Sequence, residues 1–426
     1  MATRDSATPQ VAAGSKAAAW LTVVGVGVVA ATHIWELPSA LQQLQNDLHF
    51  DLLFSGVLLG VIQVASMLGG LLAAWCGERY GLRRLLILGL FLLAAGSLLG
   101  AASPDAAVLL FSRLIEGIGF VLCTVLAPAL IRLNCATEDL NRAMGAWGSF
   151  QGLATLAGLS LSSLMLEWAS WRWLWAAMAL LTLALLIPLT KLVPDDRRTR
   201  PATTGAGGQI MTTARLATPW LTGLGFACYT VQWMAVMGFL PAIYGAFGVS
   251  ALTAGLFSAG VGGVNIIGAM VAGRMLQSGR SPSALLVFAF LAMAVSSIGF
   301  FALPWVRIGG GMVGALACAV VFSLVGGIAP AVFSRIGVDL APAGGSVSAV
   351  IGLMQQLFNV GNFIGPFILA WVAVLAGGWQ ASWLMTCGFS ALGILLVLLL
   401  HRRLGTRGPA ESREHAAGSG SAVSAR

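Results

Sequence analysis

Two long apolar runs of this chain are joined by the charged stretch Gly77-Glu78-Arg79-Tyr80-Gly81-Leu82-Arg83-Arg84. A charged side chain is excluded from the centre of a bilayer, where it costs at least about 2.5 kcal/mol. The stretch must therefore lie in water beside a membrane that the apolar runs cross. Its excess of arginine over glutamate places that water on the cytoplasmic side, because cytoplasmic loops carry most Lys and Arg.

The composition also indicates a membrane protein. Of the 426 residues, 58% are hydrophobic and 9% are charged, whereas soluble domains carry about 25% charged residues. The net charge of +8 does not indicate a nucleic-acid partner, because the arginines lie in short loops and form no basic stripe. The six cysteines lie in or beside apolar runs without zinc-ligand spacing. We therefore expect no metal and no other cofactor.

Apolar runs long enough to cross a bilayer, which takes about 20 helical residues, occur twelve times. They predict an all-α membrane protein with twelve transmembrane helices in two six-helix bundles. The bundles would cover 17–193 and 216–402, with an N-terminal tail (1–16), a linker (194–215) and a disordered C-terminal tail (403–426). The predicted spans are 17–39, 53–75, 84–103, 107–132, 142–165, 172–193, 216–245, 251–275, 283–303, 309–333, 346–374 and 380–401.

The distribution of Lys and Arg predicts the orientation. With the N-terminus inside, only Arg172 and Arg307 of the 23 Lys and Arg residues face outward, and Arg113 lies within a span. All the others fall on the cytoplasmic side, as the positive-inside rule requires. We expect both termini in the cytoplasm and a multi-pass protein of the plasma membrane, the inner membrane in a bacterium.

The two halves are similar to each other. Leu37-Pro38 in the first span has a counterpart in Leu240-Pro241 in the seventh, and Gly81 before the third span matches Gly279 before the ninth. The segment 127–132 ends the fourth span as 329–335 ends the tenth, each beginning Ala-Pro-Ala. Similar segments in the same order at nearly one offset predict a parallel duplication of six spans.

Two six-span halves with a charged turn after the second span resemble the major facilitator superfamily over residues 17–402. The turn is similar to that family's loop motif, an acid followed by Arg-x-Gly-x-Arg-Arg, with Glu78 where Asp is usual. Arg113, Gly117 and Gly119 resemble the motif of span 4, whose arginine faces the central cavity. The resemblance implies a transporter that works by alternating access and needs no cofactor. It also implies a small-molecule substrate and a functional monomer in the lipid bilayer.

One motif of the family departs from the pattern. The antiporter signature of span 5 contains a Gly-Pro pair, where this chain has Gly158-Leu159, and the pair occurs in span 11 as Gly365-Pro366. This departure speaks against a drug/proton antiporter. A narrower likeness to the cyanate/nitroimidazole porter branch rests on segments 116–120, 127–131 and 143–147.

Four ionisable residues lie within the predicted spans: His33, Glu36, Arg113 and Glu116. Their spacing puts each pair, in spans 1 and 4, on one helix face, and His33 and Arg113 lie at similar depth. The resemblance implies that these spans line the cavity, so the two faces could meet there. We expect Arg113 to attract the substrate or balance the carboxylates, and Glu116, Glu36 or His33 to exchange a proton. The alternatives are a self-neutralising Arg113–Glu116 pair, a water-exposed Glu36 and a structural His33.

The second half offers neutral polar side chains within its spans. Tyr229 and Gln232 on span 7 are the best candidates to contact a substrate, and Gln355 and Asn359 on span 11 are further ones. Hydrogen bonding without charge suits a small polar substrate. The alternative for each residue is a hydrogen bond between helices that only holds the bundle together.

The opening stretch has a second predicted role. Glu78, Arg79, Arg83 and Arg84, turned by Gly81, could pair with neighbouring helix ends at the cytoplasmic mouth and separate when that side opens. The counterpart before span 9 keeps Arg274, Gly279 and Arg280 but has no acid. The alternative is a determinant of topology alone.

Secondary transport is the leading function. The chain has no metalloprotease, nucleophile-elbow or phosphate-loop motif, so we expect no enzyme and no ATP-driven pump. A channel would not be expected to carry both family motifs. A buried arginine and the missing Gly-Pro pair favour proton-coupled import of a small organic or inorganic anion, a symporter; proton-coupled export of drug-like compounds is the alternative.

Overall fold

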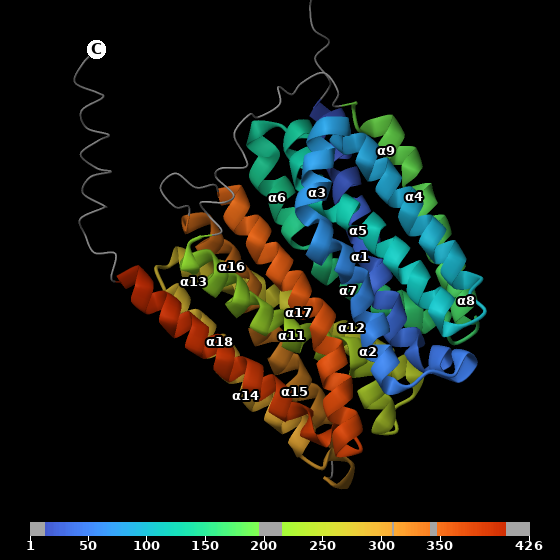
Figure 1. Cartoon of the computed structure of the whole chain (residues 1–426), viewed down its shortest axis with the longest axis vertical. Coiled ribbons are helices and arrows are strands. Elements are labelled where there is room, and N and C mark those ends of the chain that lie inside the picture. Colours follow the sequence, from blue (N-terminus) through green and yellow to red (C-terminus); the bar gives the residue numbers. More distant parts are fainter. Residues whose placement is uncertain (1–12, 196–214, 309–310, 341–346, 406–426) are drawn as a thin grey trace, which may run out of the picture.

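The computed structural model describes residues 13–195, 215–308, 311–340 and 347–405, and every regular element in these ranges is a helix. The predicted linker and both tails lie largely outside the described residues. The chain forms two helical halves (Figure 1). The first half contains α1 (Ala13–Leu48), α2 (Leu52–Gly60), α3 (Val64–Tyr80), α4 (Leu82–Ala101), α5 (Ala106–Asn134), α6 (Leu140–Gly148), α7 (Phe150–Met165), α8 (Trp171–Ala184) and α9 (Leu186–Leu192).

The second half repeats this arrangement after the linker. It contains α11 (Ala217–Ala246), α12 (Ala251–Gly263), α13 (Asn265–Gln277), α14 (Pro282–Ala302), α15 (Gly311–Gly326), α16 (Ile328–Asp339), α17 (Val347–Ala376) and α18 (Ser382–Gly405).

The predicted all-α fold with twelve spans in two bundles is confirmed. Eleven of the helical segments are long and apolar enough to cross a membrane, and the remaining span has a shorter apolar helix, Phe150–Met165. This fifth span is shorter because it breaks at Ser149, which separates α6 from α7. Large apolar side chains such as Phe91 and Phe288 are exposed on the outer helices, as expected for surfaces that face lipid.

Two local features recur in both halves and support the predicted duplication. The second span is interrupted by a 3-10 turn at Val61–Gln63, and the eighth breaks at Val264. The turns that follow these spans both use a glycine with positive φ, 101° at Gly81 and 81° at Gly279. Only glycine adopts such angles without strain, which explains why both turns contain this residue.

The halves touch through glycines at one end of the bundle. A Cβ added to Gly56 of α2 would lie 2.8 Å from backbone atoms of Pro366 and Phe367 on α17. A Cβ added to Gly60 would lie still closer to the backbone carbonyl oxygen of Phe363. Gly255 and Gly262 of α12 leave room for the side chains of Ser163 and Thr155 on α7. We call these α2–α17 and α7–α12 contacts the seam. α2 and α3 are successive parts of one span, and the Gly77–Arg84 turn lies at the end of α3. The α2 side of the seam therefore lies at the other end of that span.

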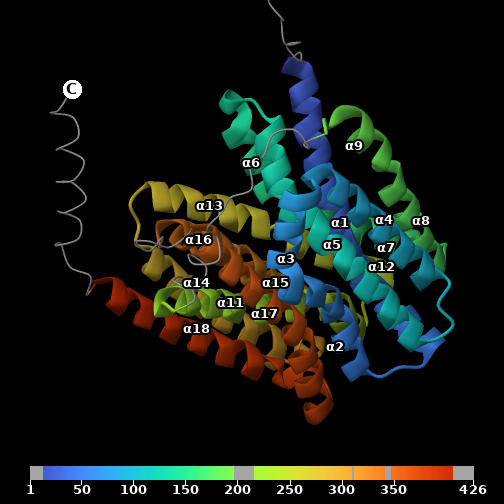
Figure 2. The ribbon, with the colours of Figure 1, turned by 45° about the horizontal axis from the view of Figure 1, so that its top comes forward.

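The opposite end, which carries the Gly77–Arg84 turn, is arranged differently. There α6 packs against α1, α5 and α7 of its own half, and α13 packs against α15 and α16 of the other half. Figure 2 shows α6 with the first half and α13 with the second. At this end α6 and α13 thus make their main contacts within their own halves, whereas the two halves meet along the seam.

Candidate functional site

The four ionisable residues of the spans form one buried cluster. Arg113 on α5 donates hydrogen bonds from Nη1 to Glu36 Oε1 on α1 (2.8 Å) and to Glu116 Oε2 (2.5 Å). Its Nη2 donates to the backbone carbonyl of His33 (2.6 Å). All four side chains have 0% exposure. The expected meeting of the two helix faces is confirmed, and the water-exposed alternative for Glu36 is wrong in this conformation.

Two hydroxyl groups complete the cluster, and the sequence analysis did not single them out. Ser97 on α4 lies 2.7 Å from Glu116 Oε1 and 3.1 Å from His33 Nδ1. Thr182 on α8 lies 2.8 Å from His33 Nε2. We call the six residues the ion cluster: His33, Glu36, Ser97, Arg113, Glu116 and Thr182.

The ion cluster lies inside the first half. Its polar atoms are enclosed by α1, α4, α5 and α8, whereas the sequence analysis placed the two charged faces at a cavity between the halves. The close approach of α4 depends on Gly96, where a Cβ would lie 2.5 Å from Glu116 Cγ. The cluster therefore lies within one half and not between the two.

The charges of the cluster are unequal when His33 is neutral. One guanidinium then faces two carboxylates in a site without solvent access, where an uncompensated charge is strongly destabilising. His33, Glu36 and Glu116 place nitrogen and oxygen atoms within 4.8 Å of one another, a spacing that a metal ion could bridge. The guanidinium between the carboxylates already supplies the positive charge, so the donor set suits a proton better than a metal ion.

The polar candidates of the second half do not converge on one place. Gln232 donates to the carbonyl of Cys228 (2.8 Å) and accepts from Ser390 on α18 (2.9 Å), so it is satisfied within its own bundle. The hydroxyl of Tyr229 accepts a bond from Asn265 (3.3 Å). On α17, Asn359 is buried and Gln355 is exposed.

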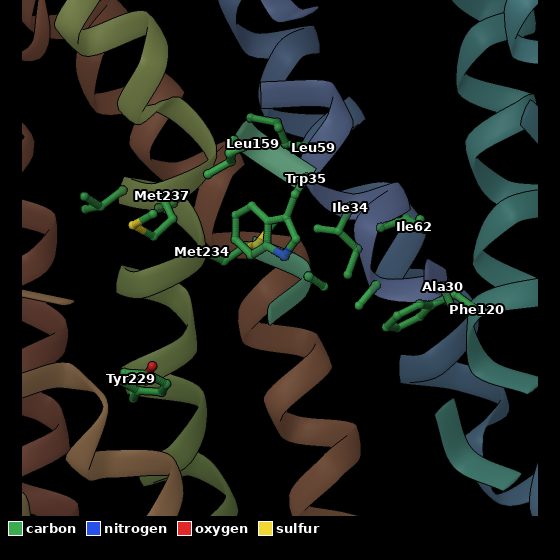
Figure 3. Close-up of a cluster of buried hydrophobic side chains, with 14 of the residues drawn as sticks. Ala30, Ile34, Trp35, Leu59, Ile62, Phe120, Leu159, Tyr229, Met234 and Met237 are labelled. Carbon is green, nitrogen blue, oxygen red and sulfur yellow. The ribbon is translucent and has the colours of Figure 1, made fainter. Parts of the chain in front are cut away.

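One aromatic contact joins α1 to α11, and further aromatic rings continue along α11. The ring of Trp35 meets that of Trp233 edge-on, with centroids 5.4 Å apart. Tyr229 and Phe226 follow on the same face of α11, with centroid distances of 6.4 Å and 6.3 Å along the series. Figure 3 shows Trp35 beside Met234 of α11, with Tyr229 further along that helix. We call Trp35, Trp233, Tyr229 and Phe226 the aromatic row.

The Gly77–Arg84 stretch makes its described contacts within the first half. Arg83 donates to the carbonyl of Thr190 at the end of α9 (2.6 Å), and the guanidinium of Arg79 lies 5.6 Å from the ring centre of Trp75. Arg84 is exposed. The side chain of Glu78 lies outside the described part of the structure. The predicted gating role of this stretch stays a prediction.

Comparisons with known proteins agree with this architecture. The sequence model of the Major Facilitator Superfamily matches residues 21–358 and also 223–424. The D-xylose–proton symporter has the same fold, with a TM-score of 0.72 at 17% identity over 90% of this chain and 96% of that one. A bacterial homologue of the human lysosomal transporter Spinster, in an inward-facing and occupied conformation, gives a TM-score of 0.77 at 13% identity over 92% and 98%.

Curated relatives match over different lengths. The puromycin resistance protein of Streptomyces alboniger is 33% identical over 154 residues, 35% of this chain and 27% of that protein. The alignments with the first curated relatives thus span about a third of their length or less. The cyanate transport protein of Escherichia coli is 23% identical over 360 residues, 81% of this chain and 86% of that protein. Because the superfamily model spans most of the sequence and the fold matches over nine-tenths of the chain, this protein belongs to the Major Facilitator Superfamily.

Proposed function

We propose that this membrane transporter is driven by protons and moves a small solute between its two halves by alternating access. The observation that carries the proposal is the ion cluster, which holds two carboxylates, one guanidinium and one imidazole without solvent access. Such a set changes its net charge when it gains or loses one proton. A conformation in which the cluster is buried is therefore stabilised or destabilised by that proton.

Small anions were the substrates favoured by the sequence, because Arg113 offered a buried positive charge. In this conformation Arg113 is engaged by two carboxylates and a backbone carbonyl. This geometry supports the other expected role of Arg113, the balancing of Glu36 and Glu116. An anion bound between the halves would have to be held by other groups.

The aromatic row favours a solute with an apolar or aromatic part, as in the drug-like alternative. Rings along one face of α11 can stack on such a solute, and aromatic contacts add to the energy of apolar burial. The small-anion candidate keeps one observation in its favour, the relative named as a cyanate transport protein, which aligns over most of the chain. We place the drug-like solute first.

A thermal-shift screen separates the two substrate classes, because a ligand that binds the folded state raises its melting temperature. We expect aromatic compounds such as puromycin and chloramphenicol to raise the melting temperature of the purified protein, and cyanate to leave it unchanged. A Trp233→Ala variant should lose the shift. A rise with cyanate alone would establish the anion candidate instead.

Replacement of Glu116 by Gln tests the proton coupling. In vesicles loaded with the compound found by the screen, we expect the wild type to move it against its gradient when a pH gradient is imposed. Glu116→Gln should lose this gradient-driven accumulation and keep exchange at equal concentrations, because with one carboxylate removed Arg113 and Glu36 balance each other without a proton. Glu138→Gln, at an exposed position of the loop after α5, is the control. Full accumulation in Glu116→Gln would remove Glu116 from the coupling role.

We also propose that both termini face the cytoplasm of a bacterial inner membrane, as the arginine distribution predicts. A C-terminal fusion to a fluorescent protein that matures only in the cytoplasm should fluoresce. A dark fusion that is fully inserted would reverse the orientation.

A further inference from the structure

The hydroxyl groups beside His33 have their hydrogens directed elsewhere. Thr182 Oγ1 lies 2.8 Å from the carbonyl oxygen of Met178, one turn earlier on α8. Ser97 Oγ lies 2.7 Å from Glu116 Oε1. A hydroxyl has one hydrogen to donate and two lone pairs that accept. When each hydroxyl donates to its oxygen partner, both present a lone pair to the imidazole of His33.

Both ring nitrogens of His33 therefore face acceptors. Nδ1 lies 3.1 Å from Ser97 Oγ, and Nε2 lies 2.8 Å from Thr182 Oγ1. A neutral imidazole donates from one nitrogen and accepts at the other, whereas an imidazolium donates from both. The imidazolium form matches the two acceptors without turning either hydroxyl away from its oxygen partner.

The carboxylates offer poorer positions for a proton. Both oxygens of Glu116 already accept hydrogen bonds, from Ser97 and from Arg113. Oε2 of Glu36 has no hydrogen-bond partner among the described residues, so a proton on it would find no acceptor, whereas a proton on either nitrogen of His33 finds one. The carboxyl group of Glu36 is nevertheless the competing position, because a buried carboxylate oxygen without a donor is itself unfavourable. The ring spectrum described below separates the two.

We propose that His33 holds the transported proton in this conformation and is the residue that couples proton movement to transport; the coupling part of this proposal rests on the proposed function. The cluster then contains two cations, Arg113 and His33, and two anions, Glu36 and Glu116. His33 Nδ1 lies 3.8 Å from an oxygen of each carboxylate. These two carboxylates and Arg113 are the charged groups that face His33 from α1 and α5, and α4 and α8 contribute the hydroxyls of Ser97 and Thr182.

Loss of the proton changes the balance of the cluster. Neutral His33 leaves one net negative charge enclosed by four helices, so the buried arrangement becomes unfavourable until the cluster reaches water. Release of the proton and opening of this part of the first half are thereby linked. Ser97 and Thr182 are positioning residues in this scheme, because they hold the imidazole through its two nitrogens.

Nitrogen NMR of the ring tests the assignment without any substrate. The chain has four histidines, and replacing His49, His401 and His415 by Gln leaves His33 as the one labelled histidine. At pH 7.5 an exposed histidine is mostly neutral, since its usual pKa is about 6.5. For full-length protein in lipid nanodiscs we expect both nitrogens of His33 to be protonated at this pH. A signal from an unprotonated ring nitrogen would overturn the assignment.

Thr182→Val supplies the matched test of the hydrogen-bond argument. Valine keeps the shape of threonine and removes the acceptor for Nε2, so a signal from an unprotonated Nε2 of His33 should appear in the same spectrum. Thr190→Val, exposed on α9, should give the wild-type spectrum. A wild-type spectrum in Thr182→Val would contradict the role of that hydroxyl. Protonated His33 together with full accumulation in Glu116→Gln and His33→Gln vesicles would keep the protonation state and refute the proposed coupling.

Discussion

At the scale of single residues, the ion cluster shows what a sequence can and cannot specify. The i, i+3 spacing and similar depth of the two charged pairs were sufficient to predict that they meet. Ser97 and Thr182 could not be predicted, because a hydroxyl in an apolar helix usually bonds to its own backbone, as Thr22 does to the carbonyl of Ala18. Thr182 makes that local bond too, and only the packing of α8 against α1 adds His33.

Gln232 illustrates how little a sequence says about the direction of a polar side chain. Its place on span 7 suggested a contact with substrate, and the structure directs it toward Ser390 of α18 within the second bundle. The hydropathy of α11 does not indicate which face of the helix points to the other half. Nearly the whole helix is buried, with 83% of its most apolar 18-residue segment inside the molecule. Helix direction can be predicted only where one face is exposed and the other is not.

Gly96 provides a prediction at this scale. A methyl group at this position would collide with Glu116 Cγ and with the carbonyl oxygen of Ser112. We expect Gly96→Ala to destabilise the folded protein by about 1–3 kcal/mol, as overpacking does, and to lower its melting temperature in a thermal unfolding scan.

The matched control for this change is Gly25→Ala on α1, where no atom lies within 4 Å of the added carbon. Both variants gain the same helix propensity, up to about 1 kcal/mol, so their difference reports the clash alone. Equal melting temperatures would mean that α4 can move away from the cluster at no cost.

At the scale of helices, the spans were predicted and their interruptions were not. The breaks at Val61–Gln63, Ser149 and Val264 contain no proline, and each directly follows a glycine. The chain has 54 glycines, so a glycine alone did not single out these positions. Proline itself was an unreliable guide, because Pro38, Pro128, Pro241 and Pro366 all lie inside continuous helices.

The turn between α3 and α4 gives a prediction at the scale of elements. Gly81 has φ of 101°, so Gly81→Ala should cost about 1–2 kcal/mol of stability through backbone strain. Gly70→Ala on α3, with no atom within 4 Å of the new carbon, should be neutral or stabilising. Chemical denaturation of the two purified variants measures the difference. Equal stabilities would show that the turn relaxes to another conformation.

At the scale of the whole molecule, two bundles and their order along the chain followed from the sequence, while the state of the transporter did not. Hydropathy is the same whether the halves meet at one end or at the other. The structure shows them joined at the seam, where Gly56 and Gly60 bring α2 against the backbone of α17. Alternating access requires this contact to open when the other end closes.

Gly60→Leu should shift that equilibrium. A leucine side chain between α2 and α17 separates the halves at the seam and so favours the conformation closed at the opposite end. Spin labels on Arg142→Cys of α6 and Gln277→Cys of α13, both exposed positions, would report it in a background without the native cysteines. We expect a new population at shorter distance.

Gly69→Leu on α3 is the control for this measurement, because no atom lies within 4 Å of a carbon added there. It should leave the distance distribution of the wild type unchanged. The same distribution in Gly60→Leu would show that the seam is not the contact that holds the halves in this state.

One turn of α1 carries both activities assigned to this molecule. Trp35 follows two residues after His33 and precedes Glu36, yet its ring lies against Trp233 of the other half while its neighbours lie in the ion cluster. The helix is rigid over so short a distance, so these groups can move only together. Any rotation of this turn that follows a change in charge of the ion cluster also changes the contact of Trp35 with Trp233. A single helical turn thus couples the protonation of one half mechanically to its contact with the other half.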